Sequence, residues 1–213
     1  EGVVISPILI CESGRSRFQE IEDLFRSSRY PSRMLDDNLA DLAAQSACNH
    51  YGVMALQELA RASSCEVVLR NMTELCRHAA EVLRSKLLPL TGRRWQGEDV
   101  LDDGTRIQVL LRCSDEGLKV DFSGSGPVHD GNLNATESIV RSAVLYVLRA
   151  WVGDHLPLNK GLLDDVHIKT PEGILSPVFP EDPAACPAVV GGNVETSQRI
   201  VDVLLGALDL QAN

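Results

Sequence analysis

The stretch with the richest chemistry is a polar run that precedes an apolar helix pattern near the end of the sequence. Asn193 suits the cap of a helix, and Glu195 places a negative charge where free amides and the helix dipole favour one. Thr196, Ser197 and Gln198 then add uncharged side chains that form hydrogen bonds. Capping accounts for Asn193 and Glu195 at most. Capping therefore leaves the rest of the cluster unexplained.

A second polar pattern occurs in an alanine-rich stretch. Asp41, Gln45 and Asn49 are spaced by four residues, so they form a stripe along one side of a helix. Small neighbouring side chains allow a ligand or another backbone to approach such a stripe closely. The alternative interpretations are a solvated helix face and polar contacts between two packed helices.

Other candidate chemistries lack the residues they need. Gly124 and Gly126 are not followed by the lysine of a phosphate-binding loop, so they predict a bend after a hairpin. Cysteine–histidine pairs such as Cys48 with His50 lie two positions apart in helical sequence and cannot converge on one metal ion. His155 and His167 have no nearby ligand partners at a metal spacing. The sequence thus predicts no metal site and identifies no catalytic residue.

Composition narrows the class of protein. The chain has 213 residues and a formal net charge of −10, which argues against binding to nucleic acid or to an anionic membrane. No apolar run approaches the roughly 20 residues of a membrane span. Six cysteines are scattered without a Cys-x-x-Cys pair, which is typical of reduced thiols in a cytoplasmic protein.

The first part of the chain predicts a strand followed by helices. The apolar run 3–11 suits a strand, and helices are expected at 16–28, 37–62 and 65–88, the last with Ser63 and Glu66 as a capping box. In the third helix one face recurs at intervals of four and three residues, as in a seam between packed helices. That face consists of Val68, Met72, Leu75, Ala79 and Val82. With a link of only a few residues, the 37–62 and 65–88 helices are expected to form an antiparallel hairpin.

The second part predicts a sheet covered by helices. Alternation of apolar and polar residues in 106–113 and 118–122 indicates a β-hairpin with one buried face. Further strands are expected at 165–169 and 188–190, and helices at 137–152 and from residue 194 onward. Asn134 and Glu137 are spaced as a helix cap.

The fold class is therefore α+β. A long antiparallel helical hairpin is expected to pack beside a small antiparallel sheet that the later helices cover. We expect residues 1–92 to form the strand and helical hairpin region, and residues 93–213 to form the α+β region.

Four separated motifs resemble the hydantoinase B family, which includes subunits of ATP-dependent hydantoinases, 5-oxoprolinases and some ketone carboxylases. The strongest is Gly-Asn-Val-Glu-Thr-Ser-Gln at 192–198. The other three are similar to the family in the same order: Asn-Leu-Ala-Asp-Leu-Ala-Ala-Gln at 38–45, with Ala40 where glycine is usual, Asp-Phe-Ser-Gly-Ser at 121–125, and Pro-Leu-Asn-Lys-Gly at 157–161. Glu1-Gly2 and the following apolar run match the start of the family's second half.

The resemblance implies a function for a longer parent protein. A hydantoinase A-like, ATP-binding subunit or domain would phosphorylate a cyclic amide or enol oxygen, and the hydantoinase B part would help to convert the activated intermediate. The implied activity is ATP-dependent hydrolysis of a cyclic amide such as hydantoin or 5-oxoproline. The alternatives are a non-catalytic scaffold or interaction module and part of a ketone carboxylase subunit. The candidate residues for substrate binding or for an interface are Asn193, Glu195, Thr196, Gln198, Asp41 and Gln45.

The same resemblance implies what the chain lacks. Family members are usually longer, with an upstream His/Asp-rich segment expected to bind metal and a glycine-rich downstream part. The chain resembles the central portion only, as a fragment of a larger subunit. ATP, Mg²⁺ and a further divalent metal are therefore expected in the parent complex and not in this chain. We expect the isolated chain to be inactive and to be part of a hetero-oligomer.

Overall fold

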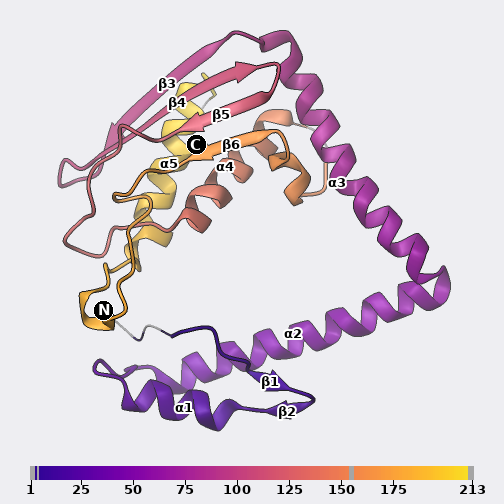
Figure 1. Cartoon of the computed structure of the whole chain (residues 1–213), viewed down its shortest axis with the longest axis vertical. Coiled ribbons are helices and arrows are strands. Elements are labelled where there is room, and N and C mark those ends of the chain that lie inside the picture. Colours follow the sequence, from indigo (N-terminus) through magenta and orange to yellow (C-terminus); the bar gives the residue numbers. More distant parts are fainter. Residues whose placement is uncertain (1–2, 4, 154–155, 211–213) are drawn as a thin grey trace. The chain divides into compact units, whose positions relative to one another are not determined.

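The computed structural model has an α+β fold, which confirms the predicted class (Figure 1). It describes residues 3, 5–153 and 156–210. The chain forms two compact units. The first contains residues 1–71 and 181–185, and the second contains residues 72–180 and 186–213. The predicted division of the chain into regions 1–92 and 93–213 stays a prediction.

The described part of the first unit contains two short strands, two complete helices and the beginning of a third. β1 (Cys11–Glu12) and β2 (Arg15–Ser16) form a small antiparallel hairpin. Helix α1 (Phe18–Ser27) contacts helix α2 (Leu35–Ala62) and buries Ile21. The prediction of a strand over 3–11 is wrong, because residues 5–9 have no regular secondary structure. An apolar run is not enough to form a strand, because a strand also needs a neighbouring strand with which to pair. Glu1 and Gly2 of the family-like start lie outside the described residues.

The two long helices follow one another as predicted, but their predicted seam is not buried. Helix α3 (Cys65–Leu87) begins directly after the end of α2, and no residue of α2 is buried. Of the expected seam only Ala79 is buried, whereas Met72 and Leu75 remain exposed. The buried face of α3 instead repeats every four residues, at Ala79, Leu83 and Leu87.

Helix α3 begins at the expected residue, but its cap differs from the expectation by one position. The backbone amide of Val67 donates to the hydroxyl of Ser64 at 3.2 Å. Ser64 therefore caps the helix, whereas Ser63 is the C-cap of α2. The expected capping box of Ser63 with Glu66 is corrected accordingly.

The second unit contains a mixed four-stranded sheet of order β3-β4-β5-β6. Its strands are Arg94–Val100, Arg106–Ser114, Gly117–Asp121 and Val166–Lys169. The first three are antiparallel neighbours, as the alternation predicted for β4 and β5. The fourth, β6, runs parallel to β5, so the expected all-antiparallel sheet is corrected. A parallel neighbour requires a crossover, which here includes helix α4 (Glu137–Val152). Residues 188–190, predicted as a strand, have no strand structure.

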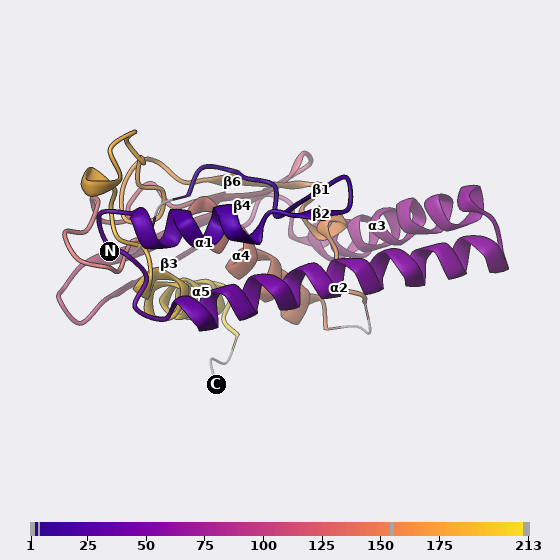
Figure 2. The same ribbon diagram turned by 90° about the horizontal axis from the view of Figure 1, so that it is seen from below.

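The predicted covering helices pack on this sheet. Figures 1 and 2 show α4 and α5 (Glu195–Ala207) beside the strands of the second unit. One face of β4 and β5 is buried, and α4 and α5 each add one apolar stripe to the same core. These residues are Ile107, Val109, Leu111, Leu118 and Val120 from the strands, and Val140, Val144, Val147, Ile200, Val203 and Leu204 from the helices.

Strand β3 was not predicted, because its sequence is polar and contains Gly97 in its centre. The structure explains the glycine. A Cβ atom at Gly97 would lie 2.4 Å from the backbone oxygen of Val203 and 3.0 Å from the Cβ of Ala207, both in α5. The strand therefore approaches the helix backbone more closely than any side chain would allow.

Replacing Gly97 is expected to destabilise the chain. Gly97→Ala should lower the free energy of unfolding by about 1–3 kcal/mol, because strand and helix must move apart. Chemical denaturation measures the change. The matched control is Gly206→Ala in α5, where a Cβ would meet nothing within 4 Å; it should be neutral or stabilise by about 1 kcal/mol or less. Equal effects of the two substitutions would contradict the close approach.

Candidate functional site

The polar run at residues 193–198 is held by a loop at residues 129–135. A short 3-10 turn, Gly191–Asn193, leads into α5. The amide of Gly191 donates to the backbone oxygen of Asn132 at 2.8 Å. A Cβ at Gly192 would lie 2.0 Å from the backbone oxygen of Asn134, so only glycine fits there. The motif's glycine is thus explained by backbone packing.

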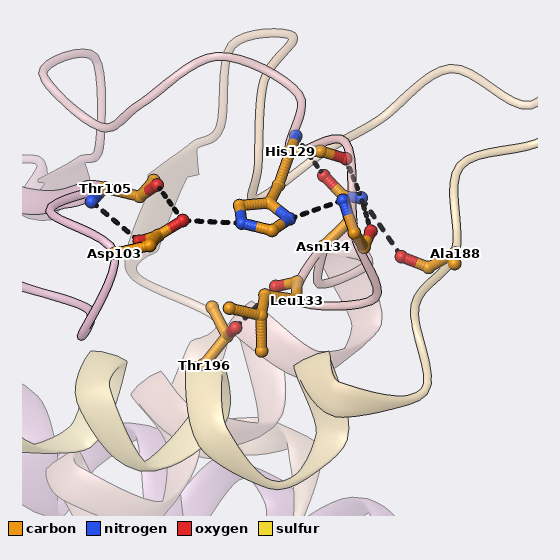
Figure 3. Close-up of polar contacts among 8 residues, drawn as sticks. Asp103, Thr105, His129, Leu133, Asn134, Ala188 and Thr196 are labelled. Atoms are coloured by element: carbon orange, nitrogen blue, oxygen red, sulfur yellow. Dashed lines mark hydrogen bonds and ion pairs between the residues drawn. The ribbon is translucent and has the colours of Figure 1, made fainter.

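Thr196 belongs to the same attachment. Its side chain is fully buried, and its hydroxyl donates to the backbone oxygen of Leu133 (Figure 3). Thr196 is therefore a structural residue at the start of α5, and its hydroxyl does not face a ligand. Sequence reasoning had counted it among the binding candidates because spacing alone does not show which side of the helix is buried.

Asn134 organises the loop that receives this segment. It is fully buried, its Nδ2 group donates to the backbone oxygens of His129, Gly131 and Ala188, and its Oδ1 accepts from the amide of His129 (Figure 3). The expectation that Asn134 caps α4 is wrong. The carboxylate of Glu137, its predicted partner, instead accepts hydrogen bonds from the hydroxyls of Thr170 and Ser176.

His129 connects this loop to the turn between β3 and β4. Its Nε2 lies 2.6 Å from a carboxylate oxygen of Asp103, and its Nδ1 accepts a hydrogen bond from the amide of Gly131 at 2.8 Å (Figure 3). The backbone amide of Thr105 above all, then the His129 ring and the Thr105 hydroxyl, lower the pKa of the Asp103 carboxyl from its ordinary value. Nothing local in the sequence links His129 to Asp103, because the two residues are 26 positions apart.

The exposed part of the polar run lines a cleft between α4 and α5. The cleft has a volume of about 520 Å³. Asn193, Ser197 and Gln198 lie along one side, and the opposite side comes from α4. The lining residues are Ile139, Ser142, Ala143, Tyr146, Asn193, Ser197, Gln198, Val201 and Asp202. This cleft is the candidate functional site.

Its chemistry is that of binding and not of nucleophilic attack. Of the lining residues, Asp202 is the one with an ionisable carboxyl, and none is basic. The hydroxyl of Ser142 donates to the Ser138 backbone oxygen, and that of Ser197 donates to the backbone oxygens of Asn193 and Val194. A serine whose proton is held by a backbone carbonyl has no general base to activate it. Exposed carboxamides and a phenol beside apolar walls can instead bind a small, uncharged polar ligand.

The predicted residues are therefore distributed unevenly. The structure brings Asn193 and Gln198 together in the cleft, and it places Thr196 in the core. Glu195 is exposed in the first turn of α5 and does not line the cleft. Asp41 and Gln45 are exposed on α2, in the first compact unit. Their roles in binding stay predictions.

Tyr146 and Asp202 were missed by the sequence analysis. The signal was present for Tyr146, because Ile139, Ser142 and Tyr146 recur at intervals of three and four on one side of α4. Tyr146 is 58% exposed, which is unusual for a large side chain on a helix otherwise packed against a sheet.

Two further family-like motifs have structural roles. In the 157–161 motif, Asn159 accepts from the amide of Gly161 and donates to the backbone oxygen of Leu75, while a Cβ at Gly161 would lie 2.0 Å from the backbone oxygen of Cys76. This motif therefore attaches to α3.

In the 121–125 motif, Ser125 bonds both the amide and the backbone oxygen of Gln108, which closes the bend after β5. A Cβ at Gly124 would lie 2.1 Å from the Gln108 side-chain oxygen. A larger residue at position 124 would therefore displace the end of the Gln108 side chain.

Three further observations concern metal ligands, a buried thiol and the apolar character of the helices. Among the described residues no group of three or more His, Cys, Asp or Glu side chains could hold a metal ion. Burial, and to a lesser extent Asp115, raises the pKa of the Cys113 thiol, which makes it a poor nucleophile. None of the helices in the described part of the chain is long and apolar enough to cross a membrane. His155 lies outside the described residues.

Comparison with known proteins assigns the family. The model of the hydantoinase B/oxoprolinase family matches residues 1–213, so the chain belongs to this family. It is 36% identical over 225 residues to a 5-oxoprolinase of Saccharomyces cerevisiae and 38% identical over 223 residues to a 5-oxoprolinase of Dictyostelium discoideum. Each alignment covers 100% of this chain but 17% of the relative, so the chain spans about one sixth of their length.

The fold also has a counterpart among solved structures. It is similar to an ATP-dependent caprolactamase from Pseudomonas jessenii, with a TM-score of 0.78 over 98% of this chain and 36% of the other. The two share 23% sequence identity, so the similarity concerns the fold alone.

Removing the Thr196 hydroxyl is expected to destabilise the attachment of α5. Thr196→Val keeps the shape but leaves the Leu133 backbone oxygen without this donor, which should cost about 1–3 kcal/mol in unfolding free energy. Ser197→Ala, one position further along, removes a hydroxyl that bonds within its own helix and should change stability by about 0.5 kcal/mol or less. Urea denaturation of both variants tests the difference; equal losses would contradict the structural role of Thr196.

Asp103 is expected to make stability sensitive to acid. Because the folded state lowers its pKa, its contribution is present above the ordinary aspartate pKa of about 3.9 and is lost as the pH falls through the folded value. Asp103→Asn should therefore lower the unfolding midpoint at pH 7, and the difference from the unaltered chain should shrink below about pH 4. Denaturation series at several pH values measure this, with Asp115→Asn as the matched control. A difference that is constant from pH 7 to pH 3 would refute the assignment.

Proposed function

We propose that this chain is the part of an ATP-dependent cyclic amide hydrolase, of the hydantoin or 5-oxoproline type, that helps to position the activated substrate. The observation that supports it most directly is the cleft between α4 and α5. Three residues of the family's signature segment, Asn193, Ser197 and Gln198, line that cleft, whereas Gly192 and Thr196 fix the segment to the core.

The chemistry of the cleft suits a lactam or a related ring. A cyclic amide presents one carbonyl oxygen and one N–H group, and carboxamide side chains such as Asn193 and Gln198 both donate and accept hydrogen bonds. Ile139, Ala143 and Val201 add apolar surface for the carbons of a ring. Such a site fixes orientation, which is a large part of catalysis even without an acid or a base.

The hard chemical step is assigned to other parts of the parent complex. An amide is a poor electrophile because resonance stabilises it, and phosphorylation of its oxygen by ATP supplies a better leaving group. Water then attacks the carbon of the phosphorylated amide, and the tetrahedral adduct expels the ring nitrogen as an amine, which leaves an acyl phosphate. A second water hydrolyses the acyl phosphate to the carboxylate and inorganic phosphate. A hydantoinase A-like subunit or domain would bind ATP and Mg²⁺, and a further divalent metal would be bound outside this chain. The scattered cysteines favour a reducing, cytoplasmic location.

A scaffold role is the alternative, and the surface of α2 supports it. Tyr51 is 73% exposed, and Val53, Met54, Leu56 and Leu59 are all more than 40% exposed on the same helix. Helices that are apolar on several sides are usually covered by protein. In this alternative α2 docks a partner, and the cleft has no ligand.

Substitutions in a longer protein that contains this segment distinguish the two roles. Asn193→Ala and Gln198→Ala should each lower kcat/KM for lactam-dependent phosphate release by about three- to tenfold, the effect of losing one hydrogen bond. Glu195→Gln should lower turnover at least about tenfold if this carboxylate belongs to the reaction site, and should only cost about 0.3–1 kcal/mol of stability if it complements the helix dipole.

Gln96→Ala, an exposed carboxamide on β3, is the matched control. Full activity of all three variants, with partner binding lost on substitution in α2, would favour the scaffold. The chain by itself should release no phosphate and consume no hydantoin or 5-oxoproline with Mg²⁺ present. Metal-dependent lactam opening by the chain alone would overturn the proposed division of labour.

A further inference from the structure

The contacts of His129 have no part in the proposed function. Its side chain is 18% exposed, and both ring nitrogens have partners. Because Nδ1 accepts a hydrogen bond from the Gly131 amide, Nδ1 has no proton. The proton of the neutral ring is then on Nε2, which donates to Asp103 at 2.6 Å. The two bonds together fix the tautomer and the orientation of the ring.

The loop held by His129 is the one that positions the cleft wall. The backbone oxygen of Asn132 accepts a hydrogen bond from the Gly191 amide, and that of Leu133 accepts one from the Thr196 hydroxyl. Gly192 packs closely against the backbone oxygen of Asn134. Residue 193, which follows directly, lines the cleft. An uninterrupted series of hydrogen bonds and close packing therefore leads from the β3–β4 turn through His129 to the cleft.

We infer that His129 is a positioning residue for the α4/α5 cleft. By joining Asp103 to Gly131 it holds loop 129–135 in the conformation that receives the Gly191–Gln198 segment. The inference rests on the proposed function only for the importance of the cleft, because the coupling itself is a property of the structure.

A direct catalytic role for His129 is not supported. The residue does not line the cleft, and its Nδ1 lone pair is already used by the Gly131 amide. To act as a base it would have to release the loop that shapes the site. A role in positioning requires no such release.

Substitutions can separate the two bonds. In His129→Asn, the side-chain oxygen can take the place of Nδ1 and accept from Gly131, but the shorter side chain does not reach Asp103. In His129→Gln, the amide nitrogen can take the place of Nε2 and donate to Asp103, while the Gly131 acceptor is lost. His129→Ala removes both bonds. His167→Ala, an exposed histidine on β6, is the matched control.

Hydrogen–deuterium exchange of the full chain measures the coupling without any need for activity. In His129→Ala, amides of residues 186–199 should exchange about three- to tenfold faster, as expected for loss of one or two hydrogen bonds, while strands β4 and β5 keep their protection. His129→Asn should restore most of the protection, and His167→Ala should change nothing.

A spectroscopic measurement tests the tautomer separately. The ¹⁵N signals of the His129 ring in the unaltered chain should show a proton on Nε2 and none on Nδ1. A proton on Nδ1, unchanged exchange of residues 186–199 in His129→Ala, or an equal increase over the whole second unit would each overturn the inference.

The outcome is independent of the proposed function. If faster exchange of residues 186–199 is found but Asn193→Ala and Gln198→Ala leave turnover of the longer protein unchanged, the coupling stands and the substrate role of the cleft fails. If those two variants lose turnover but exchange is unaffected in His129→Ala, the cleft stands and His129 is not its positioning residue.

Discussion

The arrangement of the candidate site depends on one buried carboxamide, that of Asn134. Its two amide protons and its oxygen bind the backbone at His129, Gly131 and Ala188, which joins a loop to a segment 54 residues further along the chain. A buried polar side chain is costly unless its hydrogen bonds are satisfied, so this loop has essentially one conformation that the fold tolerates. Gly192 and Thr196 then pack against that conformation.

The periodic elements of the fold could be predicted from sequence because burial imposes their period. Ile107, Val109 and Leu111 alternate on a strand with one buried face, and α4 and α5 each repeat apolar residues at helical spacing. Strand β3 could not be found in this way. It lies at the edge of the sheet, and its burial against α5 comes from the absence of a side chain at Gly97. The parallel direction of β6 is likewise set by the crossover before it and not by its own residues.

The candidate site was predictable in location but not in the role of each residue. The run of polar residues before an apolar helix identified the segment, and its resemblance to the hydantoinase B family is confirmed by the family match over the whole chain. The helix-cap rule, however, gave the wrong residue for both α5 and α4. Val194, not Asn193, precedes α5, and Asn134 serves the loop instead of α4. The causes differ: Asn193 is the last residue of the preceding 3-10 turn and lines the cleft, whereas the Asn134 side chain bonds the backbone of Ala188, 54 residues away.

A rigid support of this kind suits a site whose lining is mainly carboxamides, hydroxyls and apolar side chains. Carboxamides orient a substrate well only if their own positions are fixed, since freedom of the side chain would cancel much of the gain from each hydrogen bond. The β3 strand contributes to this rigidity from the other side. Asp99 pairs with Arg199, one residue after Gln198, and the amide of Val100 and then the Arg199 guanidinium lower the pKa of the Asp99 carboxyl. The segment that lines the cleft is thus fixed to the sheet at Asp99 and to loop 129–135 at Thr196. Two attachments on one short helix turn leave Asn193 and Gln198 exposed on a backbone that has little freedom to move.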